Sequence, residues 1–275
     1  MRDQLCIEFL QWALPRLGLR WPGFRKVRGQ VCKRIQKRIR ELNLPDIGAY
    51  SAYLEQNPEE WAILDPLCRV TISEFYRDKG VFEALGGEVL PRLAQAAQQK
   101  GETVLRIWSA GCASGEEPYT LSLLWKFQLQ DRYPDLKLDV VATDIDAALL
   151  ERARQACYPP SSVKVLPKDW LDRGFVVRAH QLCLRPELTE AVHFLKQDVR
   201  EKHPEGLFHV VLCRNLAFTY YDAVGQKRVL ERIREVLLPG GALVLGTHES
   251  LPEKECGFKP GAARMPIFKK VSDSP

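Results

Sequence analysis

The chain has 275 residues, of which 45% are hydrophobic and 27% charged, and its formal net charge is +5 at pH 7. This composition excludes disordered and collagen-like proteins and leaves room for one large domain or two smaller ones. It has no run of about 20 apolar residues, so we expect no membrane insertion. The first residues, MRDQLCIEFLQWALPRL, do not resemble a signal peptide.

The first 75 residues show only helical patterning and predict a small all-α domain over residues 1–75. In the segment 25–44, apolar residues recur at helical spacing, and basic residues fall on the opposite face. The apolar stripe comprises Val31, Ile35, Ile39 and Leu42, and the opposite face carries Lys33, Lys37 and Arg40. Two further helices are predicted over residues 47–55 and 58–67.

Basic residues are concentrated at the N-terminus. Residues 1–40 contain eleven Lys and Arg and only two acids, whereas the remainder of the chain has a slight acidic excess. Such an asymmetry favours an acidic partner, and we expect the basic helix to dock an acidic protein substrate. A solvated helix face is the alternative. Nucleic acid is disfavoured because no aromatic residue is interleaved with the basic residues of segment 25–44 and the chain has no known nucleic-acid-binding motif.

From residue 104 onward, strand-like apolar runs alternate with helical segments. The runs cover residues 104–110, 138–144, 192–198, 209–215 and 242–247, and the helical segments cover 116–130, 146–156 and 224–238. This alternation predicts a doubly wound, Rossmann-like α/β domain over residues 76–275. The segment 157–190, rich in Pro, Val and Arg, is predicted to be an irregular insertion.

The first predicted strand ends in Ala110 and a glycine-containing turn, where a ligand can approach the backbone closely. Gly111 and Gly115 are four residues apart, so the turn lacks the dinucleotide fingerprint. Glu116 and Glu117 follow, where a pyrophosphate would otherwise bind the helix N-terminus. Carboxylates repel phosphate but suit the ammonium and sulfonium groups of S-adenosylmethionine (SAM). A tight turn without a ligand is the structural alternative.

Acids and polar residues follow the next three strands. Asp144, after the second strand, can accept hydrogen bonds from both ribose hydroxyls, and Asp146 is predicted to cap the following helix. Asp198, after the third strand, can accept a hydrogen bond from the adenine amino group. Arg214 and Asn215 end the fourth strand, where burial without partners would be costly. Helix N-capping is the alternative for Asp144, a solvated loop acid is the alternative for Asp198, and ordinary loop pairing is the alternative for Arg214 and Asn215.

Together these segments resemble the chemotaxis receptor methyltransferases, the CheR family. The resemblance covers residues 25–251 and rests on several motifs in the family's order. They are SEFYRD at 73–78, WSAGCASGEEPYT at 108–120, ATDID at 142–146, CRN at 213–215, LPGG at 238–241 and GTHESL at 246–251. The resemblance implies an all-α N-terminal domain, a SAM-binding class I methyltransferase domain, and O-methylation of glutamates on a chemoreceptor-like protein.

The resemblance also implies roles for individual residues. The SAM contacts of the family map onto Ser73, Arg77, Glu116, Asp144, Asp198, Val199, Arg214 and Asn215, in addition to the turn at Ala110 and Gly111. The active-site tyrosine maps onto Tyr220, and Arg77 orients either the SAM carboxylate or the substrate glutamate. An interdomain salt bridge is the structural alternative for Arg77.

Three departures from the family pattern affect these roles. The motif CRNLAFTYYD is one residue longer than usual, so Tyr221 is an alternative to Tyr220. Asp198 replaces the usual Asn. The segment 176–185 is short for the family's small β-subdomain, which makes binding of a receptor tail doubtful. A diverged methyltransferase acting on another protein or small acid, and a non-catalytic SAM-binding scaffold, therefore remain alternatives.

Eight cysteines are scattered along the chain without a CxxC pair or a histidine at metal-ligand spacing. We therefore expect reduced core cysteines, no bound metal and a cytoplasmic location.

Overall fold

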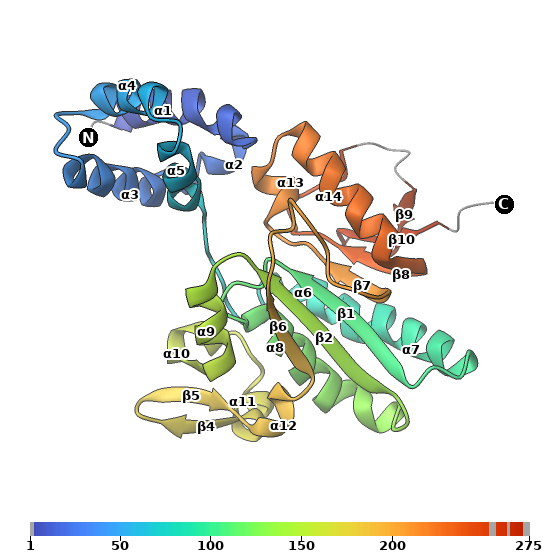
Figure 1. The fold of residues 1–275 in the computed structure, drawn as a ribbon. Helices are drawn as coiled ribbons and strands as arrows, with labels where there is room; N and C mark the ends of the chain where they lie inside the picture. Colours follow the sequence, from blue (N-terminus) through green and yellow to red (C-terminus); the bar gives the residue numbers. More distant parts are fainter. Residues whose placement is uncertain (1–2, 253–256, 263–264, 272–275) are drawn as a thin grey trace. The chain divides into compact units, whose positions relative to one another are not determined.

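A computed structural model describes residues 3–252, 257–262 and 265–271. The chain divides into two units (Figure 1). The helical unit comprises Met1–Thr71 and Thr219–Gln226, and the α/β unit comprises Ile72–Phe218 and Lys227–Pro275. The segment Thr219–Gln226 therefore packs with the helical unit although it follows the fourth strand of the long sheet in sequence. None of the helices described is long and apolar enough to cross a membrane.

The helical unit confirms the predicted all-α N-terminal domain. Its elements are α1 (Asp3–Ala13), η1 (Leu14–Leu17), α2 (Trp21–Phe24), α3 (Arg28–Glu41), α4 (Ile47–Gln56) and α5 (Glu60–Cys68). Helix α3 buries Val31, Ile35 and Ile39, as the apolar spacing predicts. Lys33, Lys37 and Arg40 are exposed on this helix. The basic face is thus available at the surface of the unit.

A buried carboxylate links the helices of this unit. Glu60 is 2% exposed and accepts two hydrogen bonds from Arg38, each of 2.8 Å, and one of 2.9 Å from the Tyr50 hydroxyl. The Arg38 hydrogen bonds hold the pKa of Glu60 below its usual value, although burial opposes the shift. Arg38 thereby serves the fold of the helical unit, unlike the three exposed basic residues of the same helix.

We expect Glu60→Gln to lower the stability of the helical unit by about 2 kcal/mol at pH 7, because it removes the charge that compensates Arg38. The stabilisation is present above the ordinary pKa of 4.5 and is lost as the pH falls through the lowered value of the folded state. Thermal unfolding should therefore show a gap between wild type and variant that narrows in acid. The exposed neighbour Glu59, changed to Gln, is the control, and an equal loss in both variants would contradict the assignment.

The α/β unit contains a seven-stranded sheet of order β6-β2-β1-β7-β8-β10-β9. Its strands are β1 (Val104–Ala110), β2 (Lys137–Asp144), β6 (Val192–Lys196), β7 (Phe208–Leu212), β8 (Leu237–Val244), β9 (Phe258–Pro260) and β10 (Ile267–Lys270). The first five in sequence pair in parallel, and β10 is antiparallel to both of its neighbours. This mostly parallel arrangement confirms the predicted α/β fold, whereas β9 and β10 were not predicted.

Helices connect the strands and complete the hydrophobic core. They are α6 (Lys79–Ala84), η2 (Leu85–Val89), α7 (Leu90–Gln99), α8 (Glu116–Leu124), η3 (Trp125–Leu129), η4 (Gln130–Arg132), α9 (Ala147–Gln155), α13 (Ala217–Tyr220) and α14 (Ala223–Val236). The core joins residues of β1, β2, β7 and β8 to the buried sides of α6, α7 and α8. The apolar runs of the parallel strands are buried here, which leaves the strand ends for polar residues.

The expectation of an irregular insertion at 157–190 is wrong. This segment forms β3 (Cys157–Tyr158), α10 (Pro160–Val163), α11 (Lys168–Gly174), β4 (Phe175–Arg178), β5 (Gln181–Leu184) and α12 (Pro186–Thr189). The strands make a small antiparallel sheet of order β3-β5-β4 (Figure 1). The hairpin turn uses Ala179 and His180 at positive φ, without the Asn-Gly or Gly pattern by which such turns are recognised.

The expectation that all cysteines are reduced is also wrong. Disulfides join Cys6 to Cys32 in the helical unit, and Cys157 to Cys183 across β3 and β5. The two cysteines of each disulfide are 26 residues apart in sequence. A separation of this size matches no short cysteine motif, so it did not indicate which cysteines pair. Cys68, Cys112 and Cys213 are free and buried, and Cys256 lies outside the described residues. The described residues contain no cluster of three metal-ligating side chains.

Candidate functional site

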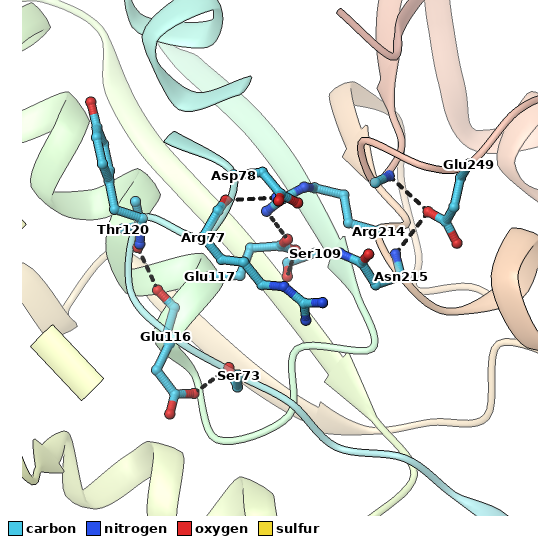
Figure 2. A network of polar contacts seen from close by, with 12 residues as sticks. Ser73, Arg77, Asp78, Ser109, Glu116, Glu117, Thr120, Arg214, Asn215 and Glu249 are labelled. Atoms are coloured by element: carbon cyan, nitrogen blue, oxygen red, sulfur yellow. Dashed lines mark hydrogen bonds and ion pairs between the residues drawn. The ribbon is translucent and has the colours of Figure 1, made fainter. Parts of the chain in front are cut away.

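The carboxyl ends of β1, β2, β6 and β7 lie along one edge of the long sheet, because these strands are parallel. The predicted site residues of the α/β unit follow these strand ends or lie in the segment before α6. Figure 2 shows the polar contacts that several of them make. One of these contacts, between Arg214 and the carbonyl of Arg77, joins residues that are 137 positions apart in sequence.

The turn after β1 is narrow and leaves space only for the backbone. Gly111 and Gly115 have φ of 76° and 92°, a conformation that favours glycine. A Cβ on Gly111 would lie 2.6 Å from Leu216 Cδ2. The amides of Gly111 and Cys112 both donate to the carbonyl of Thr143, at 2.8 and 3.0 Å, which fixes the turn against the end of β2. Ala110 is buried at the end of β1.

Asp144 connects this turn to the end of β2. Its Oδ2 accepts a 2.9 Å hydrogen bond from the amide of Ala113, and its Oδ1 accepts one of 2.9 Å from the amide of Asp146. Burial raises the pKa of Asp144, although the backbone donors oppose the shift. Asp146 caps α9 by accepting from the amides of Ala148 and Leu149, which confirms the predicted cap. Asp144 is therefore fixed by the backbone, and each oxygen retains a further lone pair for a ligand.

Glu116 carries a buried charge without a cationic partner. It is 3% exposed and accepts hydrogen bonds from Ser73 Oγ at 2.6 Å and from Ser114 Oγ at 2.9 Å. No ion pair joins it to any residue that the structure describes. Buried charges are normally paired, and two hydroxyl groups do not neutralise a carboxylate. The site therefore suits a ligand that brings its own cationic group.

Unlike Glu116, the neighbouring Glu117 is ion-paired with Arg214. Its carboxylate accepts from Ser109 Oγ at 2.7 Å and from Arg214 Nη1 at 2.9 Å. The same guanidinium donates through Nη2 to Asp78 Oδ2 at 2.8 Å and to the carbonyl of Arg77 at 2.7 Å (Figure 2). Arg214 therefore uses most of its side-chain donors within the protein. Arg77 is half-buried, and its guanidinium donates to the carbonyl of Ile72.

The loop after β7 is held by a residue for which the sequence indicated no role. Glu249 is 9% exposed, and its Oε2 accepts from the amides of Asn215 and Gly246, both at 2.7 Å. Asn215 has a φ of 54°, which is less costly for asparagine than for most residues. The one available signal was that Glu249 lies in the GTHESL motif. Its carboxylate ties the end of β7 to the end of β8.

Asp198 is engaged more fully than the sequence indicated. Its Oδ1 accepts from the amide of Arg200 at 2.8 Å, and its Oδ2 forms an ion pair with Arg200 Nη2 at 2.8 Å. Val199, which follows it, is buried. Accepting a hydrogen bond from adenine therefore requires Asp198 to use a remaining lone pair beside Arg200.

Tyr220 and Tyr221 belong to the helical unit, so the geometry within the α/β unit does not assign either one to the site. The ring of Tyr220 packs 5.1 Å from that of Phe24, and Tyr221 is 8% exposed. The choice between the two tyrosines stays a prediction.

The residues present fit SAM. Glu116 offers a buried carboxylate to the ammonium group, and Asp144 offers acceptor oxygens to the ribose hydroxyls. The carboxylate of Glu116 in the first turn of α8 is unfavourable for a phosphate group. This donor set distinguishes SAM from a dinucleotide.

Comparisons with known proteins agree with this interpretation. Residues 71–265 match the CheR methyltransferase SAM-binding domain, and residues 26–64 match the CheR methyltransferase all-alpha domain. The chain is 33% identical to a chemotaxis protein methyltransferase of Salmonella typhimurium, over 81% of this chain and 76% of that protein. It is 32% identical to chemotaxis protein methyltransferase 2 of Vibrio cholerae, over 80% of this chain and 77% of that protein.

A larger protein is also similar. The chain is 33% identical to an uncharacterized 104.1 kDa protein of Rhodobacter capsulatus, over 88% of this chain but only 25% of that protein. The chain therefore spans about a quarter of that relative.

Proposed function

The chain belongs to the CheR methyltransferase family and has its SAM-binding domain, and on this premise we propose that it methylates glutamate side chains of a chemoreceptor-like protein. The observation that carries the proposal is the buried Glu116, which has no cationic partner among the described residues, beside the strand ends that carry Asp144 and Asp198. This arrangement supports SAM binding, and the relatives named chemotaxis methyltransferases support the acceptor.

The proposed chemistry needs positioning more than proton transfer. SAM supplies an electrophilic methyl group on its sulfonium. A substrate glutamate, with an ordinary pKa near ~4.3, is ionised at neutral pH, so no general base is required. The protein must hold the carboxylate oxygen in line with the methyl and sulfur atoms. It must also avoid stabilising the carboxylate too strongly, because attack consumes its charge.

We assign Ser73, Glu116, Asp144, Asp198, Val199 and Asn215 to cofactor binding, with Ala110 and Gly111 shaping the turn. Arg77 is assigned to the methyl-transfer end, where its guanidinium orients a carboxylate of the cofactor or the substrate. Tyr220 is assigned to the same end, where its hydroxyl group contacts the substrate; packing of its aromatic face beside the cationic sulfonium is the alternative, which a phenylalanine would preserve.

The direct test is methyl transfer from radiolabelled SAM to a purified chemoreceptor cytoplasmic fragment. We expect base-labile incorporation into the fragment, as a carboxyl methyl ester requires. A fragment with Gln in place of its methylatable Glu residues is the control and should take up no label. SAM binding without label transfer to the fragment would reject a receptor acceptor and favour a diverged methyltransferase for another protein or small acid.

The longer CRNLAFTYYD motif is the observation that favours that second candidate, because it alters the loop next to the acceptor. Calorimetry with SAM and S-adenosylhomocysteine (SAH) separates a SAM-binding protein, whether catalytic or not, from a scaffold without a cofactor site. A scaffold that has lost the cofactor site would bind neither of them.

The basic face of α3 is proposed to dock an acidic protein substrate. Replacing Lys33, Lys37 and Arg40 with Ala should raise the KM for the receptor fragment about tenfold at low salt, and by less at physiological salt because the attraction is screened. Affinity for SAM should not change. Steady-state kinetics at two salt concentrations measure both effects.

The matched control is a triple Ala variant of three exposed lysines in the α/β unit, namely Lys126, Lys137 and Lys202. It makes the same change in net charge and should leave the KM near the wild-type value. Equal effects of the two triple variants would show that net charge matters, and that α3 is not a docking surface.

Tyr220 and Tyr221 can be separated by their phenylalanine variants, which remove only a hydroxyl group. We expect Tyr220→Phe to lower kcat by about tenfold, the scale of one lost hydrogen bond. Tyr221→Phe should retain a kcat within twofold of wild type. The opposite ranking, measured in the same methyl-transfer assay, would assign the active-site role to Tyr221.

We propose that the protein acts in the cytoplasm. The disulfides Cys6–Cys32 and Cys157–Cys183 are an unusual feature for that location, because such bonds are uncommon in a reducing compartment. Trapping of thiols in intact cells, followed by mass spectrometry, would measure their state.

A further inference from the structure

Arg77 is presented by a turn with an unusual backbone. Tyr76 and Asp78, on either side of it, have φ of 56° and 59°. Left-handed backbone is disfavoured for residues other than glycine and is rare for a bulky aromatic. Such a conformation persists only where surrounding contacts hold it, and it is found preferentially at functional sites. The contacts around this turn therefore determine where the Arg77 side chain lies.

The N-terminal side of the turn is held by α8 and by aromatic packing. The amide of Tyr76 donates to Thr120 Oγ1 at 3.1 Å. The Tyr76 ring is buried, stacks on Phe82 at 5.5 Å, and meets the edge of Trp170 at 5.5 Å. None of these three contacts reaches the backbone on the C-terminal side of Arg77.

The C-terminal side is held by Arg214. Its Nη2 donates both to the carbonyl of Arg77, at 2.7 Å, and to Asp78 Oδ2, at 2.8 Å. One guanidinium group thus fixes the peptide unit that follows Arg77 and the side chain of the next residue (Figure 2).

Arg214 is itself immobilised. Its side chain is 3% exposed, its Nη1 donates to Glu117, and its guanidinium carbon lies 5.0 Å from the centre of the Phe82 ring. Glu117 is in turn held by Ser109 of β1. The planar guanidinium group can donate to Asp78, to Glu117 and to the carbonyl of Arg77 at the same time, whereas the compact ammonium group of a lysine cannot. The chain Ser109–Glu117–Arg214 thereby ties the Arg77 turn to the sheet.

We propose that the Arg214 side chain is a positioning residue that acts through Arg77, and that it does not bind the cofactor itself. This proposal rests on the proposed role of Arg77 at the methyl-transfer end. The cofactor contact that the family resemblance implies at this position is then made by the main chain. Among the described residues, the Nε atom of Arg214 lacks a hydrogen-bond partner, so it is the atom through which this side chain would contact a cofactor. The test must therefore detect a direct contact between that atom and the cofactor.

The first experiment is hydrogen exchange, followed by mass spectrometry, on the full chain without ligand. Arg214→Lys should accelerate exchange in peptides covering residues 74–82 at least tenfold. Asp78→Asn, which keeps Arg214 intact but removes the charge of its partner, should act in the same direction. Arg106→Lys is the matched control, since Arg106 pairs with Asp139 on the same sheet at 2.8 Å, and it should leave these peptides unchanged.

The second experiment is a double-mutant cycle on SAH affinity, measured by calorimetry. In the Arg77→Ala background, adding Arg214→Lys should change the SAH dissociation constant by less than twofold, whatever Arg77→Ala does alone. A further loss of fivefold or more would mean that Arg214 contacts the cofactor and would overturn the proposal, as would unchanged exchange at residues 74–82. Both readouts are independent of the acceptor, so a failed methyl-transfer assay with wild-type protein would leave them interpretable.

Discussion

Asp144→Ala is expected to weaken SAM binding about 5- to 150-fold, which corresponds to a loss of about 1–3 kcal/mol. Two effects contribute. The substitution removes the acceptor proposed for the ribose hydroxyls, and it releases the amide of Ala113, which now donates to Asp144 Oδ2 at 2.9 Å. Calorimetric titration of the folded variant with SAM measures the loss.

The matched control is Asp146→Ala, which removes the same charge two residues away. Asp146 caps α9, so this variant should lose about 1 kcal/mol of stability and keep its SAM affinity. If Asp144→Ala is folded and binds SAM as tightly as wild type, Asp144 does not belong to the cofactor site.

The same residue predicts a pH dependence. Burial raises the pKa of Asp144 above its ordinary value of 3.8. A ligand whose hydroxyls donate to the ionised carboxylate loses affinity as the pH falls through the raised pKa, and the loss begins at a higher pH than for an exposed aspartate. Titrations from neutral pH into the acid range should show this decline in wild type. Asp144→Asn cannot titrate and should lack this component.

Glu249→Ala is expected to destabilise the α/β unit and to lower kcat. The substitution leaves the amides of Asn215 and Gly246 buried without their acceptor, at a cost of about 1–3 kcal/mol each. Loss of the first amide contact also frees Asn215 from its left-handed conformation, in the loop proposed to lie beside the cofactor. We expect a lower melting temperature and at least a tenfold fall in kcat for methyl transfer.

Glu249→Gln is the informative control. Both amides donate to the same oxygen, Oε2, so a glutamine that places its carbonyl oxygen there can accept both hydrogen bonds without a charge. This variant should retain most of the stability and turnover. If glutamine is as damaging as alanine, the negative charge is required and the role of Glu249 is more than holding the loop. Wild-type stability in the alanine variant would contradict the assignment altogether.

The sequence by itself determined the features that depend on local periodicity. The spacing of Val31, Ile35 and Ile39 predicts the buried stripe of α3, and the apolar runs predict the five parallel strands. Acids directly after strands were recognisable as candidate ligands because parallel strands bring their carboxyl ends to one edge. Motif order was enough to recognise the family, which the matches to both of its domains confirm.

The family resemblance placed a short β-subdomain at residues 176–185, but the strand pairing of the small β-sheet was not predicted because it is not a local property. Strands β3, β4 and β5 are only two to four residues long, too short for an alternating pattern. The pairing of Cys157 with Cys183 depends on the register of β3 and β5, which no spacing in the sequence records.

The partners of the polar side chains were decided only by the tertiary structure. The sequence presented Arg214 as a residue for the cofactor, but its guanidinium binds Asp78, 136 positions earlier in the chain. Glu249 had no role until the ends of β7 and β8 were brought together, which placed its carboxylate on the amide of Asn215. Periodicity reports which face of an element is buried, but a buried charged group takes whichever partner the packing of distant segments brings within hydrogen-bonding distance.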